Sequence, residues 1–308
     1  MTSDAIPPPA GQKPAAPLPP PKIAERAVVV RGVRLATAMS DAPRALLARA
    51  PLVVLPSAGF VWRDYTSVME RFAPERRVFA FDWPGFGGSA RPSPNDFSYT
   101  LDTFSDIFAA WLDAMGIARA VLLGSAMGAV VALRFAAARP LRAAGLALVS
   151  PLGFARPGVV STVIARAAAS TPLLRLTWPL ATSLLLGPTT PLAAPVAERH
   201  RTLRRTPDFG VSLAAHAALW RDLPAAARDL PVLARPIAAP ALVVRGALDP
   251  LVTAADAHRA AESIGTHGAL EVTLPGAGHL PFLQQPERFG AALSGLLNTV
   301  ELAAAQLS

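Results

Sequence analysis

The sequence predicts an α/β protein whose mostly parallel sheet is covered by helices on both faces. Two observations lead to this prediction. Short apolar segments bounded by turn residues recur along the chain, and helical segments alternate with them, which is typical of parallel strands buried on both sides. The chain has 308 residues, 52% of them hydrophobic. This is enough for one sizeable domain with an insertion, or for two small domains.

The predicted elements follow in chain order. Strands are expected at residues 27–30, 33–38, 52–55, 78–81, 121–123, 145–149, 241–244 and 270–274. Apolar residues recur at helical spacing in five further segments, 62–72, 101–115, 127–139, 254–264 and 286–300. The alternation breaks between residues 152 and 235, where helical stretches and many prolines occur without a clear strand. We therefore expect a core made of residues 23–151 and 236–308, with a helical insertion at 152–235.

Composition restricts the function and the location of the protein. Residues 1–22 contain eight prolines and no apolar segment of a signal peptide, so we expect a disordered or polyproline-like tail. The absence of cysteine excludes disulfides and cysteine-ligated metals. The longest uncharged apolar stretch, 176–197, is interrupted by four prolines, so no membrane-spanning helix is expected. A cytoplasmic location is the default expectation, and the sequence leaves the oligomeric state open.

The net charge of +8 does not point to a nucleic-acid partner. Arginine supplies 27 of the 29 basic residues, which a GC-rich genome explains. A nucleic-acid-binding protein would gather its basic residues on one face or helix, often with interleaved aromatic residues, and no such helix is present. We expect a small apolar molecule as the partner instead.

A sharp turn between a buried strand and a helix is predicted at Ala126. Gly124 and Gly128 flank this residue at the second position on either side. Small residues are needed there because the two backbones nearly touch. The segment Ala120–Ala129 resembles the nucleophile elbow of the α/β-hydrolase family, Gly-x-Ser-x-Gly, with alanine at the centre.

Alanine changes what this resemblance implies. A methyl group cannot attack a carbonyl carbon, so the serine mechanism of the family is not possible with Ala126. Ser125 is a poor substitute nucleophile, because the bulky residues Leu123 and Met127 would take the two positions that need small side chains. The resemblance therefore implies an α/β-hydrolase fold, an eight-stranded sheet, and a cap or lid at the insertion.

Two later segments also resemble family motifs. Asp249 follows the predicted strand at 241–244, where open α/β sheets place their sites, although a turn or helix-capping role is the alternative. His279 lies in a loop with glycines that resembles the histidine loop of the family. The resemblance implies that Asp249 orients His279. The other histidines are expected to be exposed and lack the spacing of metal ligands: His200, His216, His258 and His267.

The loop after the third strand differs from the family pattern. Pro56 and Ser57 stand where His-Gly is usual. Backbone N–H groups do not depend on side chains, so the resemblance still implies an oxyanion hole built from Ala58 or Ser57 together with Met127. The glycine-rich loop at 82–89 is expected to be structural. The expected pocket residues are Phe60, Ser125, Trp83 and Phe86.

The remaining questions concern the insertion and the reaction. The apolar segment 159–186 could cover a lipophilic substrate, touch a membrane with Arg166 and Arg175, or simply pack on the sheet. For the whole chain we expect a hydrolase-like pocket for an apolar ester, amide or carbon–carbon substrate. His279 and Asp249 would act as a general base without a covalent intermediate. The alternative is an inactive relative that binds a ligand or acts as a scaffold. No metal or organic cofactor is expected.

Overall fold

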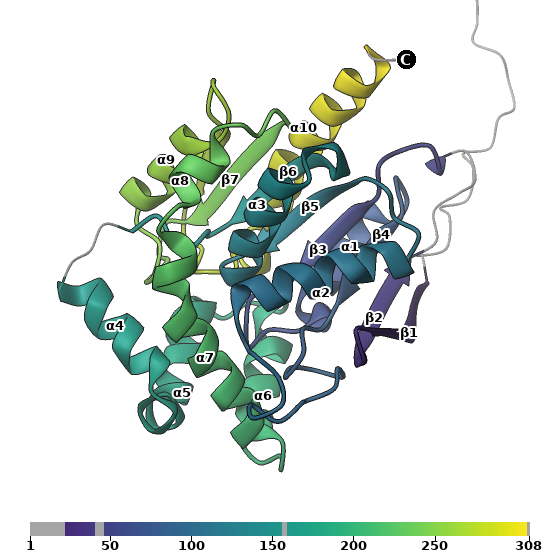
Figure 1. Ribbon diagram of the computed structural model, residues 1–308. Helices are drawn as coiled ribbons and strands as arrows, with labels where there is room; N and C mark the ends of the chain where they lie inside the picture. Colours follow the sequence, from purple (N-terminus) through teal and green to yellow (C-terminus); the bar gives the residue numbers. More distant parts are fainter. Residues whose placement is uncertain (1–21, 41–45, 156–158, 307–308) are drawn as a thin grey trace, which may run out of the picture.

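A computed structural model describes residues 22–40, 46–155 and 159–306. An eight-stranded sheet with the order β1-β2-β4-β3-β5-β6-β7-β8 forms its centre (Figure 1). The first two strand pairs are antiparallel and all the others are parallel, which confirms the predicted mostly parallel sheet. The strands are β1 Ile23–Val30, β2 Val33–Ser40, β3 Leu52–Leu55, β4 Val78–Phe81, β5 Ala120–Ser125, β6 Ala143–Val149, β7 Ala241–Gly246 and β8 Leu270–Leu274.

Helices cover both faces of the sheet, because the side chains of each buried strand alternate between two apolar cores. Val53 and Leu55 contribute to the core under α2, α3 and α9, whereas Leu52 and Val54 contribute to the core under α1 and α10. The bounds are α1 Thr66–Phe72, α2 Leu101–Ala114, α3 Met127–Ala138, α9 Ala254–Ser263 and α10 Pro286–Ala305. A 3-10 turn, Trp62–Tyr65, precedes α1, and two further short turns span Pro140–Arg142 and Pro281–Leu283.

The chain between β6 and β7 forms helices and, among its described residues, no strand. We call these the insert helices: α4 Val159–Ala169, α5 Thr171–Leu186, α6 Ala193–Leu203, α7 Phe209–Ala227 and α8 Leu230–Ala234. Helices α4 to α7 gather at one end of the sheet (Figure 1). The insertion and its boundaries at 152–235 stay a prediction. The proline-rich tail predicted for residues 1–22 lies, apart from Lys22, outside the described residues.

Helix α5 buries one side and exposes the other. Leu174, Trp178 and Leu186 are buried, whereas Leu176 is 77% exposed and Leu180 is 64% exposed. Packing against the rest of the protein therefore accounts for only one face of this apolar segment. Within the described part of the chain, no helix combines the length and the hydropathy that crossing a membrane requires.

Candidate functional site

The turn at Ala126 is held in a strained conformation. Ala126 has φ 48° and ψ −109°, a region that residues with a Cβ rarely adopt. A Cβ on Gly124 would lie 2.6 Å from Ala129 Cα, and a Cβ on Gly128 would lie 2.3 Å from the carbonyl oxygen of Leu55. Glycine is therefore required on both sides, and the close contact of strand and helix fixes the position of Ala126.

Asp249 and His279 form a buried pair. The Nδ1 atom of His279 lies 3.0 Å from Oδ1 and 2.9 Å from Oδ2 of Asp249, and the two side chains are 2% and 0% exposed. Oδ1 of Asp249 also accepts hydrogen bonds from the backbone N–H of Leu251 at 2.9 Å and of Val252 at 3.2 Å. The carboxylate thus closes a turn and holds the histidine, so the two interpretations of Asp249 are compatible.

The surroundings of Asp249 favour its ionised form. Burial by itself would raise its pKa, but the charge of His279 and hydrogen bonds from its ring and from Leu251 outweigh burial and lower the pKa. The hydroxyl of Ser150 adds to this effect. An ionised Asp249 favours the imidazole tautomer with its proton on Nδ1, which leaves Nε2 as a proton acceptor.

The turn at Ala126 and the Asp249–His279 pair lie at the carboxyl ends of the parallel strands. Ala126 follows β5, Ser150 follows β6, Asp249 follows β7 and His279 follows β8. Backbone hydrogen bonds connect the ends of neighbouring strands, from Ala126 N to Val149 O at 2.9 Å and from Ser150 N to Val244 O at 2.7 Å. The carboxyl ends of parallel strands are where open α/β sheets carry their sites.

In the loop after β3, the backbone donor of Ser57 is occupied and the next one, of Ala58, is free within the described ranges. The N–H of Ser57 donates to the hydroxyl of Tyr65 at 3.2 Å. In contrast, the N–H groups of Ala58 and Met127 donate to no residue in the described part of the chain. Burial raises the pKa of the Tyr65 hydroxyl to about 12, so this group stays neutral. Tyr65 therefore anchors the loop, a role that its apolar helical spacing did not indicate.

The four expected pocket residues have different surroundings. Trp83 is 1% exposed, stacks on Phe104 and donates from Nε1 to the Pro56 carbonyl at 2.8 Å, so it supports the loop after β3 from the protein interior. Ser125 is fully buried beside the Tyr65 hydroxyl. Phe86 lines a cavity, as described below, and Phe60 contacts an insert helix.

Two histidines of the insert helices cover the loop at 57–60. A Cβ on Gly59 would lie 3.1 Å from Nδ1 of His216. The ring of His200 lies 4.8 Å from that of Phe60 and stacks on Trp178 at 5.6 Å. Burial lowers the pKa of His200 to about 3 and that of His216 to about 4, so both rings are neutral.

The expectation of exposure is wrong for these two histidines. His200 is 3% exposed and His216 is half-buried, because they fill space between the insert helices and the loop at 57–60. His258 and His267 are exposed, as expected. The sequence contains a signal for His216, which lies in an apolar stretch of alanine and leucine, whereas His200 stands among charged residues and gives no such signal.

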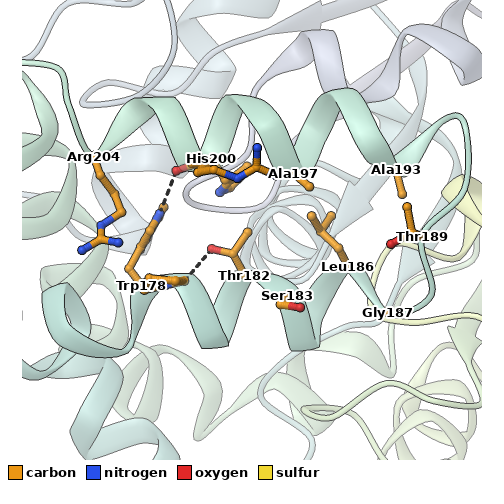
Figure 2. Close-up of a pocket in the computed structure, with 12 residues that line it drawn as sticks. Trp178, Thr182, Ser183, Leu186, Gly187, Thr189, Ala193, Ala197, His200 and Arg204 are labelled. Carbon is orange, nitrogen blue, oxygen red and sulfur yellow. Dashed lines mark hydrogen bonds between the residues drawn. The ribbon is translucent and has the colours of Figure 1, made fainter.

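Two cavities adjoin His200. The larger, of about 330 Å³, lies between α5 and α6, with Trp178, Thr182 and Leu186 on one side and Ala197 and His200 on the other (Figure 2). The smaller, of about 230 Å³, is bounded by Gly59, by the loop at 82–91 including Phe86, and by insert helices. Ala126 and His279 are each only 1% exposed. Within the described ranges, no group of three or more His, Cys, Asp or Glu side chains could hold a metal ion.

Comparison with known proteins agrees with this architecture. The family model described as "Alpha/beta hydrolase family" matches residues 52–292. A haloalkane dehalogenase from Bradyrhizobium elkani superposes with a TM-score of 0.75 at 20% identity, covering 92% of this chain and 100% of that chain. A bacterial membrane phospholipase A superposes with a TM-score of 0.71 at 21% identity, covering 91% and 87%. These two similarities concern the fold alone.

Curated relatives are similar over shorter regions. A (lyso)-N-acylphosphatidylethanolamine lipase of Bos taurus is 33% identical over 147 residues, which are 47% of this chain and 40% of the relative. A 2-hydroxymuconate semialdehyde hydrolase of a Pseudomonas strain is 36% identical over 110 residues, which are 35% of this chain and 38% of the relative. The chain thus matches less than half the length of these relatives.

Proposed function

The chain belongs to the alpha/beta hydrolase family, and we propose that its His279–Asp249 pair acts as a general base on a small or medium-sized apolar ester, amide or carbon–carbon substrate. The observation that supports this proposal is the buried contact of His279 Nδ1 with both oxygens of Asp249, at 3.0 and 2.9 Å. A structural histidine needs no such ionised partner.

The proposed step needs no covalent intermediate. Ala126 occupies the nucleophile position without a reactive atom, so water attacks the carbonyl carbon of the substrate. His279 Nε2 takes the proton of that water and returns it to the leaving group. General base catalysis of this kind contributes on the order of 10²–10⁴ in rate. The proposal assigns the oxyanion hole to the N–H groups of Ala58 and Met127, which have no other acceptor among the described residues.

We also propose that residues 152–235 form a cap over a core made of residues 23–151 and 236–308. The contacts of His200 with Phe60, and of His216 with the space over Gly59, support this division. A cap that excludes bulk solvent, while the reacting water stays in the site, would strengthen the interaction between the oxyanion and the backbone donors. Among relatives, a lipase and a semialdehyde hydrolase have names that agree with an acyl or carbon–carbon substrate.

The second candidate function is binding without turnover. The methyl group of Ala126 and the near-complete burial of Ala126 and His279 favour it. An inactive relative could use the same pocket to hold a ligand or to act as a scaffold.

Turnover of p-nitrophenyl esters of graded chain length distinguishes the two. The natural protein, Ala126→Ser and His279→Ala are assayed side by side. Slow, burst-free turnover in the natural protein that His279→Ala abolishes is the result expected for the base mechanism. Turnover restricted to Ala126→Ser, with a burst of acyl-enzyme, would replace that mechanism with the binding role. Inactivity of both the natural protein and Ala126→Ser would contradict a hydrolase-like pocket altogether.

A further inference from the structure

Three arginines from separate segments line the smaller cavity. They are Arg63 in the turn before α1, Arg91 after the glycine-rich loop, and Arg199 in α6. The side chains of Arg91 and Arg199 are 20% and 31% exposed, so two of the three charges are largely withdrawn from water. Such a gathering of cations around about 230 Å³ calls for a charge-based explanation.

Existing ion pairs use only part of these guanidinium groups. Arg63 contacts both oxygens of Glu25 through Nη2 alone, at 2.7 Å. Arg199 pairs through Nη2 with Asp64. Arg91 donates through Nη2 to the Gly87 carbonyl at 2.6 Å and through Nη1 to the Ser89 carbonyl at 3.4 Å, and Nη1 lies 3.5 Å from Asp208. Its buried Nε has no partner among the described residues. Because a guanidinium carries five N–H donors, each arginine keeps donors for a further acceptor.

The carboxyl group that lines the same cavity is held by backbone donors. Oδ1 of Asp82 accepts the N–H of Trp62 at 2.7 Å, and Oδ2 accepts the N–H of Gly88 at 2.8 Å. Burial raises the pKa of Asp82 to about 6. Asp82 thus serves the backbone of two loops with both of its carboxyl oxygens.

One further group of the cavity wall lacks a hydrogen-bond partner in the described part of the chain. His200 is 3% exposed, and neither of its ring nitrogens has a partner within the described residues. The pKa of Arg199 is lowered to about 10, first by burial and then by the charge of Arg63. The two guanidinium groups therefore repel each other although each is paired with a carboxylate, and an anion placed between them would reduce this repulsion.

We propose that this cavity binds the oxyanion group, a carboxylate or phosphate, of an amphiphilic substrate. Arginine forks recognise such groups through paired hydrogen bonds, and neutral His200 supplies one more N–H. Gly59 lines the cavity and directly follows Ala58, the proposed oxyanion donor, so the proposal links the anionic group and the reacting bond through one loop. The proposal rests on the proposed function, and it adds to the apolar substrate an anionic end.

Calorimetric titration of the natural protein tests this assignment without requiring turnover. The probes are octyl phosphate, octanol and inorganic phosphate, each at low and at physiological salt. We expect octyl phosphate to bind at least tenfold more tightly than octanol and to be displaced by excess inorganic phosphate. Equal affinity for octyl phosphate and octanol would overturn the proposal. Inorganic phosphate binding as tightly as octyl phosphate would overturn the amphiphilic ligand in favour of a free anion.

Variants separate the cavity from the general positive charge of the protein. Arg91→Gln and Arg63→Gln should each weaken octyl phosphate about tenfold and leave octanol unchanged. Arg205→Gln removes the same charge from an exposed residue outside the cavity and should change neither. Equal effects of Arg205→Gln and the two cavity variants would contradict the site. If Arg91→Gln does not fold, Arg63→Gln decides, because Arg63 is 55% exposed.

The titrations test the anion site and the ester assay tests the base mechanism, so either proposal can be rejected without the other. Octyl phosphate binding that depends on Arg63 or Arg91, in a protein without esterase activity, supports the anion site and removes the base mechanism. Esterase activity that depends on His279, with no preference for octyl phosphate, retains the mechanism and removes the anion site.

Discussion

The backbone N–H of His279 donates to the carbonyl oxygen of Leu185 at 2.9 Å. The last turn of α5 therefore supports the histidine loop directly. The contact is close, because a Cβ on Gly187 would lie 3.0 Å from Gly278 Cα. Any displacement of α5 is therefore expected to disturb His279, the proposed base. This hydrogen bond couples the insert helices to the Asp249–His279 pair.

Gly278→Ala is expected to weaken this contact. The new Cβ would meet the Leu185 carbonyl oxygen at 2.9 Å and the Gly187 nitrogen at 3.0 Å, both of them backbone atoms. We expect a loss of about 1–3 kcal/mol in the free energy of unfolding, and faster hydrogen exchange at the end of α5. Gly210→Ala is the control, because a Cβ there meets no atom within 4 Å. Similar hydrogen exchange of α5 in both variants would show that the contact at Gly278 does not couple α5 to the histidine loop.

Ala126→Gly is expected to stabilise the protein. Ala126 has φ 48°, and glycine adopts this conformation without the cost of a Cβ. Relief of this strain should raise the free energy of unfolding by about 1 kcal/mol or more. Ala129→Gly, inside α3, should lower it by roughly 0.5–1 kcal/mol. Denaturant unfolding of both variants measures the difference, and a destabilised Ala126→Gly would mean that the turn is not strained.

Asp249→Asn should disable the histidine while leaving its position nearly intact. The amide can still accept the N–H groups of Leu251 and Val252, but it no longer favours the proton on Nδ1 of His279. In an Ala126→Ser background we expect ester turnover to fall by about 10⁴-fold, the effect known for such a change in another hydrolase. Asp96→Asn, an exposed position, should leave turnover unchanged. A loss below tenfold in Asp249→Asn would exclude the orienting role.

Stability should fall in acid partly because of His200. Its pKa is lowered to about 3, mainly by burial, whereas an unfolded histidine titrates near 6.5. Below pH 6.5 the unfolded state therefore binds more protons than the folded state, and the stability contribution of the neutral ring is lost as the pH falls. Between pH 8 and pH 5 this linkage amounts to about 2 kcal/mol.

His200→Phe isolates that contribution, because it keeps a ring between Phe60 and Trp178 but removes the titration. The loss of unfolding free energy from pH 8 to pH 5 should be smaller in His200→Phe than in the natural protein. Phe60→Leu disturbs the same cluster without removing a titrating group, so it should keep the natural pH dependence. A pH dependence that is the same in all three proteins would mean that His200 is not buried and neutral.

Most strands and helices of the core were predictable because each is defined by local pattern. The buried strands at 52–55 and 78–81 occur with the predicted bounds, since an apolar run between turn residues has few alternatives. The first strand begins at Ile23, earlier than predicted. Its first four residues include the exposed, charged Glu25 and Arg26, so pairing with β2, and not hydrophobicity, defines its start.

The fold class, the turn at Ala126, and Asp249 and His279 as candidates could be predicted from the sequence, because glycine spacing and apolar runs are local features. What lies over the loop at 57–60 depends on the folded structure. His200 becomes buried, His216 half-buried, and Arg199 comes to lie beside Arg63 and Arg91, through contacts of the insert helices with segments more than a hundred residues earlier in the chain. The burial of His200 and the proximity of the charges are properties of such contacts, and no local pattern encodes them.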